Sequence, residues 1–133
     1  MSDRDDIFDL TVRYATAIDS RQYKLLSTVF TEEADLDYGV VGHWKSAAEI
    51  TEFMDAAHLG AAQTLHRMTN QAITIDGDTA TVRTYVDALI LLEDGSGANP
   101  VGCYDDHVVR TADGWRISSR TYTSVRLGGV TAQ

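Results

Sequence analysis

The sequence has little of what would cross-link a small fold or divide a chain into parts. Its 133 residues include a single cysteine, Cys103, so the chain cannot form an internal disulfide. The single proline, Pro100, and the lack of repeats or biased segments leave no sign of a linker. We therefore expect one domain over residues 1–133, without a disulfide framework.

Basic residues are also scarce. Eleven Lys and Arg against twenty Asp and Glu give a formal net charge of −9. Nucleic acids and anionic membranes both attract basic surfaces, so we expect neither as a partner. The longest apolar run, Ala88–Leu92, is far too short to cross a bilayer. Because the acidic first residues do not resemble an export signal, we expect a cytoplasmic protein.

Apolar residues at helical spacing predict three helices in the first half of the chain. One side of the first helix is apolar, with Ile7, Leu10, Tyr14, Ala17 and Ile18. An adjoining arc continues it, with Phe8, Val12, Ala15 and Asp19, so we expect this helix to be well buried. A second short helix is predicted over Tyr23–Phe30. Ser46 and Glu49 form a capping box for a third helix, which should end near Leu59.

Alternating polar and apolar residues predict strands in Ala34–Val41 and after Gly60. Four runs rich in Val, Ile, Thr and Tyr follow one another: Thr64–Ile75, Thr79–Leu92, Val101–Thr111 and Trp115–Leu127. Asp-Gly dipeptides at Gly77 and Gly114 predict hairpins between them. The order α-α-β-α-β-β-β-β indicates an α+β fold, in which three helices pack on a curved antiparallel sheet and leave a cone-shaped cavity.

Two polar residues of the first helix are candidates for chemistry. Asp19 continues an apolar arc. Burial of an unpaired carboxylate costs on the order of several kcal/mol, so we expect Asp19 to have a partner. Alternatively, Asp19 ends the helix and faces water. Tyr14 lies on the core side, where its hydroxyl either meets a backbone carbonyl or points into a cavity as a hydrogen-bond donor.

The strands supply further candidates. Alternation places His66, Met68 and Asn70 on one face of their strand. An imidazole is the natural general base near neutral pH when a carboxylate orients it, although a strand histidine is often structural. Asp87 and Arg120 stand in otherwise apolar segments, where each is either a site residue or a solvent-facing one.

Other chemistries lack their sequence patterns. No metal-ligand spacing occurs among the four histidines, His43, His58, His66 and His107. The run Asp105-Asp106-His107 could attract a cation, but adjacent strand residues point to opposite faces. A P-loop, a dinucleotide fingerprint and a G-x-S-x-G elbow are absent. We therefore expect neither a metal nor a cofactor.

A series of short motifs runs along residues 5–125. They are Arg13-Tyr14-Ala15, Ala17-Ile18-Asp19, Val29-Phe30-Thr31, His66 with Asn70, Ile75-Asp76-Gly77-Asp78-Thr79-Ala80, Gly102-x-Tyr104-Asp105 and Asp113-Gly114-Trp115-Arg116-Ile117. With these motifs the chain resembles the SnoaL-like branch of the nuclear-transport-factor-2-like superfamily. Within that branch it is most similar to scytalone dehydratase, bile-acid 7α-dehydratase and hexachlorocyclohexane dehydrochlorinase.

The resemblance implies a single cone-shaped domain and a site that works without a cofactor. It carries an acid–base dyad onto Asp19 and His66, and a phenol that holds a substrate carbonyl onto Tyr14. It places further polar site positions at Asp87 and Arg120. Relatives of this kind assemble through the open face of the sheet, which implies a homo-oligomer.

These residues predict a dehydratase, another lyase or an isomerase that acts on a small apolar cyclic carbonyl compound, polyketide- or steroid-like. His66 would remove a proton next to the carbonyl, and Tyr14 would stabilise the enolate oxygen, with help from Arg120. A polyketide-type cyclase or an epoxide opener would use the same dyad. A non-catalytic module that binds small molecules is a third reading.

Two expectations concern surfaces. The pocket should be mostly apolar, lined by Phe30, Tyr38, Phe53, Met54, Met68 and Leu89. The chain should form a dimer or trimer, because the last strands would leave apolar side chains on an uncovered sheet face: Trp115, Ile117, Tyr122 and Val125.

Overall fold

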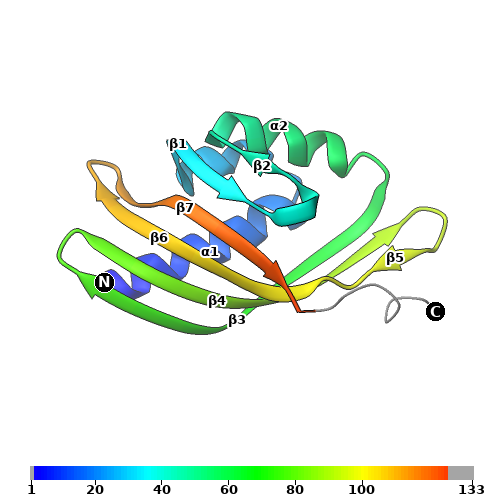
Figure 1. The fold of residues 1–133 in the computed structure, drawn as a ribbon. Helices are drawn as coiled ribbons and strands as arrows, with labels where there is room; N and C mark the ends of the chain where they lie inside the picture. Colours follow the sequence, from blue (N-terminus) through cyan, green and yellow to red (C-terminus); the bar gives the residue numbers. More distant parts are fainter. Residues whose placement is uncertain (1, 126–133) are drawn as a thin grey trace.

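The computed structural model describes residues 2–125 and has the expected α+β class (Figure 1). Its elements, with η for a 3₁₀ helix, are α1 (Asp3–Asp19), η1 (Tyr23–Thr28), β1 (Phe30–Asp37), η2 (Gly39–Val41), β2 (His43–Trp44), α2 (Ala47–Ala57), β3 (Ala61–Asp76), β4 (Thr79–Leu92), β5 (Gly97–Ala98), β6 (Val101–Thr111) and β7 (Gly114–Ser124). The second expected helix is thus a 3₁₀ helix, and β2 and β5 are additional strands. Among these residues, no helix is long and apolar enough to cross a membrane.

Helix α1 begins at a capping box that the sequence analysis did not use. The Ser2 hydroxyl accepts the Asp5 N–H, and the Asp5 carboxylate accepts the Ser2 N–H. The expected core side of the helix is buried, but Phe8 and Val12 on the adjoining arc are 45% and 41% exposed. The expectation that the whole arc is buried was wrong, because the arc lies at the open edge of the sheet, beside β3.

Helix α2 also begins where the sequence predicted it. The Ser46 hydroxyl accepts the Glu49 N–H at 3.0 Å, as a capping residue should. The Glu49 carboxylate reaches back one residue further than a capping box requires and accepts the Lys45 N–H at 2.8 Å. The helix ends at Ala57, earlier than expected, and His58 is its C-cap residue.

The seven strands form one sheet in the order β2-β1-β7-β6-β4-β3, with β5 paired to β4. Strands β1 and β7 run parallel, so the sheet is not wholly antiparallel as expected, whereas the other pairs are antiparallel. The sheet curls, and both helices lie on its inner side (Figure 1). This curl positions the strand residues that face the helices.

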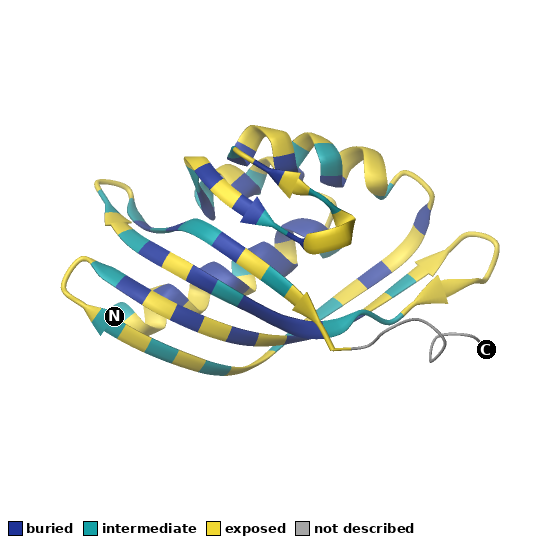
Figure 2. Cartoon of the chain, in the orientation of Figure 1, coloured by how far each residue is buried: buried dark blue, intermediate teal, exposed yellow. Residues whose placement is uncertain are grey.

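Burial alternates along each long strand and identifies the inner face (Figure 2). On β7, Trp115 and Ile117 are 4% and 1% exposed and belong to the core. Expecting them on an uncovered face was therefore wrong. On β3, alternation shifts at Asn70, a bulge residue with φ of 43°, so that Gln71 rather than Asn70 turns inward.

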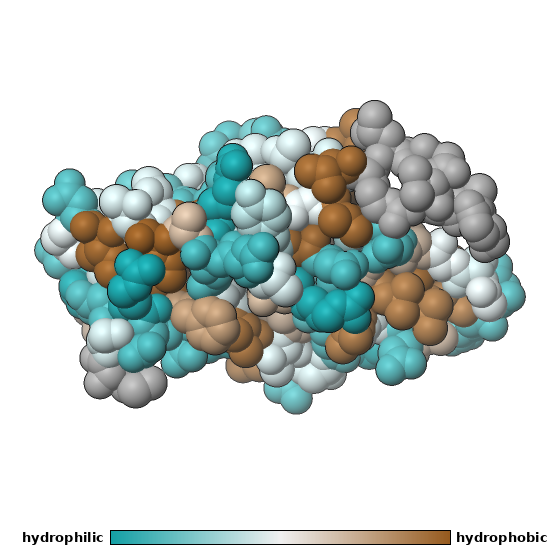
Figure 3. All heavy atoms as spheres, turned by 90° about the horizontal axis from the view of Figure 1, so that it is seen from below, coloured by the Kyte–Doolittle hydropathy of each residue, from teal (hydrophilic) through white to brown (hydrophobic). Residues whose placement is uncertain are grey.

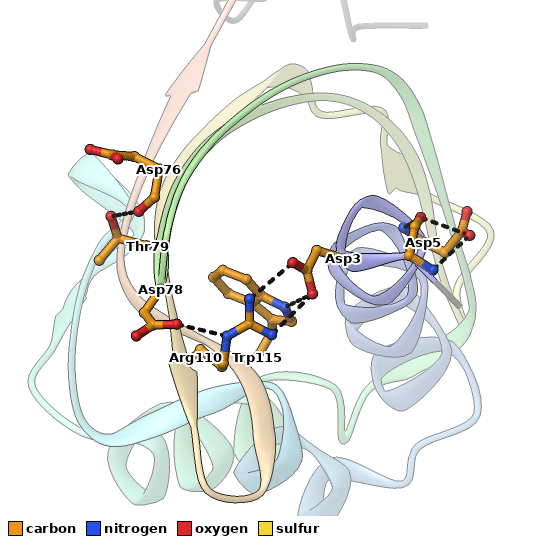
Figure 4. A network of polar contacts seen from close by, with 8 residues as sticks. Asp3, Asp5, Asp76, Asp78, Thr79, Arg110 and Trp115 are labelled. Carbon is orange, nitrogen blue, oxygen red and sulfur yellow. Dashed lines mark hydrogen bonds and ion pairs between the residues drawn. The ribbon is translucent and has the colours of Figure 1, made fainter.

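A polar network ties the start of α1 to the hairpins of the sheet (Figure 4). The Arg110 guanidinium donates to the carboxylates of Asp3 and Asp78, and the Trp115 indole N–H donates to Asp3 at 3.2 Å. The guanidinium also lies 4.5 Å from the centre of the Trp115 ring. The network fixes the N-terminal end of α1, while its other end carries Asp19.

Candidate active site

A cavity of about 230 Å³ lies between the inner face of the sheet, α1 and α2. Its walls are mostly apolar and aromatic: Tyr14, Ile18, Tyr38, Val41, Phe53, Met54, Ala57, His58, Ala61, His66, Val86, Ala88, Ile90, Leu92, Pro100, Tyr104 and Tyr122. Among residues 2–125, the polar side chains that line it are four phenols and two imidazoles, and no Asp, Glu, Lys or Arg does so. Such walls suit a neutral ligand, because a buried ion would lack a counter-charge.

His66 enters this cavity from β3 and is held by Asp19 at the end of α1. The imidazole Nδ1 lies 2.8 Å from Asp19 Oδ1, and the His66 backbone N–H donates to Asp19 Oδ2 at 2.7 Å. The Thr64 hydroxyl also donates to Asp19 Oδ1, at 2.9 Å. The hydrogen-bonded pair expected from the sequence is therefore present. Since an ionised carboxylate only accepts, Nδ1 carries the proton and Nε2 is left as a base.

The hydrogen bonds keep Asp19 ionised. Burial alone would raise the pKa of its carboxyl, but the His66 ring, the His66 N–H and the Thr64 hydroxyl together hold the pKa below its usual range. Its place in the last turn of α1 opposes ionisation, because a carboxylate there meets the negative end of the helix dipole. A carboxylate so placed and so fully bonded acts as a fixed acceptor for an imidazole.

Asp19 itself does not line the cavity. It lines a shallow groove on the outer side, with Val12, Thr16 and other residues of α1 and β3, and His66 lines both the groove and the cavity. On an ideal helix the side chains of Tyr14 and Asp19 point in directions about 140° apart, so both cannot line the same pocket. His66 bridges that gap, since its ring lies between Asp19 and the cavity.

Tyr14 lines the same cavity, edge-on to the His66 ring with centroids 6.3 Å apart. Its hydroxyl accepts a hydrogen bond from the Tyr38 hydroxyl at 3.0 Å. The Tyr38 oxygen in turn accepts from Arg120 Nη1 at 3.2 Å. Because a guanidinium can only donate, this order leaves the proton of Tyr14 for a further acceptor, which is either the Tyr104 hydroxyl, with which Tyr14 also hydrogen-bonds, or a ligand.

The phenols remain protonated at neutral pH. Burial raises the pKa of Tyr14, Tyr38 and Tyr104, and this outweighs the opposing effect of the nearby Arg120 charge. They are therefore hydrogen-bond donors and not bases, and Tyr38 already donates its proton to Tyr14.

Arg120 lies behind the phenols and not in the cavity wall, which corrects the expectation that it contacts the substrate. Its side chain is fully buried, with its guanidinium 3.8 Å from the centre of the Tyr104 ring and 4.5 Å from that of Tyr14. Two hydrogen bonds of 2.8 and 2.9 Å pair it with Asp106, which is equally buried. Arg120 thus positions Tyr38.

The expected pocket residues divide into two groups. Tyr38, Phe53 and Met54 line the cavity. Phe30 does not, because it is a core residue packed edge-on against Tyr14 with centroids 5.9 Å apart. Met68 lies in the outer groove beside Asp19.

Asp87 and Leu89 lie on the wrong face of β4 for the site. The residues of β4 that line the cavity are Val86, Ala88, Ile90 and Leu92. Since strand residues alternate, Asp87 and Leu89 point outward, where Arg67 donates to Asp87 at 3.0 Å and Leu89 is 38% exposed. Neither residue belongs to the site.

Three polar cavity residues were not assigned to the site from the sequence: His58, Tyr104 and Tyr122. Tyr104 and Tyr122 face each other in register across β6 and β7. Their alternation with the polar neighbours Asp105 and Thr121 was a usable signal. His58 had none, because a helix-end residue has no face that periodicity can assign. Among residues 2–125, no group of three or more His, Cys, Asp or Glu side chains could hold a metal ion.

Comparison with known proteins agrees with this architecture. The family model of the SnoaL-like domain matches residues 1–121. The protein Rv2910c of Mycobacterium tuberculosis, which is uncharacterized, is 34% identical over 126 residues, covering 92% of this chain and 86% of its own.

Two solved structures share the fold at lower identity. One is a candidate scytalone dehydratase from Novosphingobium aromaticivorans, with a TM-score of 0.86, 18% identity, and 92% and 84% of the two chains covered. The other is a type 2 hexachlorocyclohexane dehydrochlorinase, LinA, with a TM-score of 0.84, 18% identity, and 98% and 92% covered. The resemblance drawn from the sequence motifs is confirmed: the chain belongs to the family of SnoaL-like domains.

Proposed function

We propose that the protein is a cofactor-independent lyase or isomerase that acts on a small, neutral, cyclic carbonyl compound. The observation that carries the proposal is the Asp19–His66 pair, which leaves the unprotonated Nε2 of His66 at an apolar cavity whose other polar groups include protonated phenols. A base and hydrogen-bond donors that line one mostly apolar cavity suit the removal of a proton next to a carbonyl.

In the first step, Nε2 of His66 takes the proton from the carbon next to the carbonyl. The electron pair of the broken C–H bond forms the enolate, whose oxygen accepts the Tyr14 proton as a hydrogen bond. Asp19 stabilises the imidazolium that results, as a carboxylate does when it orients a base.

The second step depends on the substrate. If the next carbon carries a hydroxyl, the enolate oxygen reforms the carbonyl and the electron pair of the enolate C=C bond forms a new double bond between the α- and β-carbons. The C–O bond breaks with its electrons on oxygen, and the His66 imidazolium protonates the departing hydroxide to water. If a neighbouring double bond is present, the imidazolium returns the proton at a different carbon, which is isomerisation. The elimination catalysed by the dehydrochlorinase of the same fold supports the first outcome.

Simple ketones test the proposal without knowledge of the natural substrate. Cyclohexanone in D₂O reports proton removal by NMR, 3-hydroxycyclohexanone reports elimination, and cyclohex-3-enone reports isomerisation. We expect the protein to accelerate at least the first reaction. His66→Gln and Asp19→Asn should each reduce the rate about 100-fold or more, because a positioned base contributes about 10²–10⁴-fold.

The double variant should lose little more than His66→Gln alone, since the two residues act as a unit. His107→Gln is the matched control, because His107 is exposed on the outer face of β6. If none of the three ketones reacts faster than with the His66→Gln variant, the proposal fails.

A further inference from the structure

A second histidine, His58, lines the cavity from the end of α2. It precedes His66 by eight residues but comes from a different element, since His66 lies on β3. Such a residue is either a capping group that happens to border the cavity or a group that contacts the ligand.

The surroundings of His58 fix its ring. Nδ1 lies 2.7 Å from the Met54 carbonyl oxygen, and the ring stacks on Tyr23 with centroids 5.8 Å apart and planes 29° apart. Its backbone carbonyl accepts from Arg21 Nη1 at 3.2 Å, while Nη2 of the same arginine donates to the Ala61 carbonyl at 2.6 Å. Ring and backbone are therefore both held in place.

The contact with Met54 also determines the tautomer. A backbone carbonyl can only accept, so Nδ1 of His58 carries a proton, and in the neutral ring Nε2 is an acceptor. Nε2 has no hydrogen-bond partner among residues 2–125. His58 is half-buried and lines the cavity, so an acceptor on its ring that the described residues leave unpaired favours a ligand with a matching donor.

We propose that His58 selects substrates that carry a hydroxyl group, by accepting its hydrogen bond at Nε2. The inference rests on the proposed function, in that the cavity is taken as the substrate site. The hydroxyl then lies on the α2 side, while the carbonyl meets Tyr14 and the acidic carbon meets His66. The substrate class is accordingly a neutral cyclic carbonyl compound with a hydroxyl substituent, and an ether in its place leaves Nε2 unpaired.

The test measures binding in a His66→Gln background, which prevents turnover. The probes are 3-hydroxycyclohexanone and 3-methoxycyclohexanone. For each probe, NMR titration gives the dissociation constant and the change in the ¹⁵N chemical shifts of the His58 ring. We expect the hydroxyl probe to bind about 5–10-fold more tightly, the effect of one hydrogen bond, and to shift the Nε2 resonance.

Two substitutions at His58 separate the ligand contact from the capping role. His58→Asn retains a donor near the position of Nδ1 for the Met54 carbonyl but lacks the Nε2 acceptor, so the preference for the hydroxyl probe should disappear. His58→Gln can place its amide oxygen near the position of Nε2 and should restore most of the preference. Melting temperatures of all variants show that they are folded.

The inference is overturned if the two probes bind equally, if neither binds, or if the preference persists in His58→Asn. The proposed function is tested separately, by ketone turnover in the protein that retains His66. Its failure can therefore be told apart from failure of this inference. A protein that prefers the hydroxyl probe but exchanges no protons retains the role of His58 and loses the enzymatic proposal.

Discussion

Asp19 shows how a single residue can conflict with its local structure and reveal a site. A carboxylate in the last turn of a helix is electrostatically unfavourable, and this one is also part-buried. Three hydrogen bonds from β3 offset both costs. The sequence indicated the conflict, since Asp19 interrupts an apolar arc, but it could not supply the Thr64 and backbone donors, which depend on how β3 passes the helix end.

The lowered pKa of Asp19 has a consequence for stability. A carboxyl whose folded-state pKa lies below its unfolded value stabilises the fold fully above the unfolded pKa of about 4, and this contribution is lost as pH falls through the folded pKa. We expect Asp19→Asn to lower the free energy of unfolding at pH 7 by about 1–2 kcal/mol.

Urea unfolding between pH 7 and pH 3 tests this prediction. The wild-type protein should lose stability more steeply than Asp19→Asn as the pH falls below about 5. Asp9→Asn, which changes an exposed carboxylate of the same helix, is the control and should follow the wild type. Parallel curves for Asp19→Asn and the wild type would contradict the prediction.

The Asp106–Arg120 pair is the second residue-scale test. Both side chains are fully buried, so each depends on the other for its counter-charge. We expect Asp106→Asn to lower the free energy of unfolding by about 3–5 kcal/mol, because it leaves the guanidinium unpaired in the core. The double variant Asp106→Leu with Arg120→Met should be more stable than Asp106→Asn.

Urea unfolding of the single and double variants decides the point, and a loss below about 1 kcal/mol in Asp106→Asn would show that the pair is dispensable. The double variant also separates stability from positioning. It should remain folded, because no buried charge is left unpaired. Since it lacks the donor to the Tyr38 hydroxyl, it should bind and turn over ketones less well than the wild type.

At the scale of elements, the sequence predicted where the long strands lie but not which way they face. Alternation in β4 separates Val86 and Ala88 from Asp87 and Leu89, and it leaves open which set is inner. The structure places Val86 and Ala88 inside, at the cavity, and Asp87 and Leu89 outside. Hydrophobicity alone chose Leu89 for the pocket, and that choice was wrong.

The bulge at Asn70 is an element-scale feature that alternation cannot predict. It lets His66 face the cavity while Gln71 and Ile73, which have the opposite parity, also face α1. Asn70 has a left-handed backbone conformation that asparagine and glycine tolerate but branched residues do not.

We therefore expect Asn70→Gly to change the free energy of unfolding by about 0.5 kcal/mol or less, and Asn70→Val to lower it by about 1–3 kcal/mol. Thermal unfolding of both variants measures the difference. Ala72→Val, at an exposed position of the same strand with ordinary backbone geometry, is the control for introducing a branched apolar residue. Equal stability of the two Asn70 variants would exclude the strain.

At the scale of the whole molecule, the candidate site is assembled from distant parts of the chain. Asp19 comes from the first helix, His66 from β3 and His58 from the end of α2. The family resemblance linked the first two, because its motifs contain both. His58 is held by Tyr23 and Arg21, far earlier in the chain, and such a contact exists only once η1 and α2 have packed together.

The outer face of the sheet carries the last prediction. Leu65, Tyr85 and Leu89 are 46%, 47% and 38% exposed on β3 and β4, and Leu65 pairs in register with Leu89. Apolar patches of this kind alternate with polar ones on the side of the molecule that Figure 3 shows from below. These residues are not the β7 residues that the sequence led us to expect. They nevertheless form an exposed apolar surface, and such surfaces mark interaction sites.

We expect a second copy of the chain to cover this face, giving a dimer or trimer. The outward ion pairs Arg67–Asp87 and Arg83–Asp105 place both charge signs beside the apolar side chains, which suits a self-complementary interface. Light scattering at micromolar concentration should report the mass of two or three chains. Leu89→Glu should shift the mass to one chain, because it buries an unpaired carboxylate at the interface, whereas Val40→Glu, on the exposed η2 turn, should not. A wild-type protein with the mass of a single chain would show that this apolar face stays open to water.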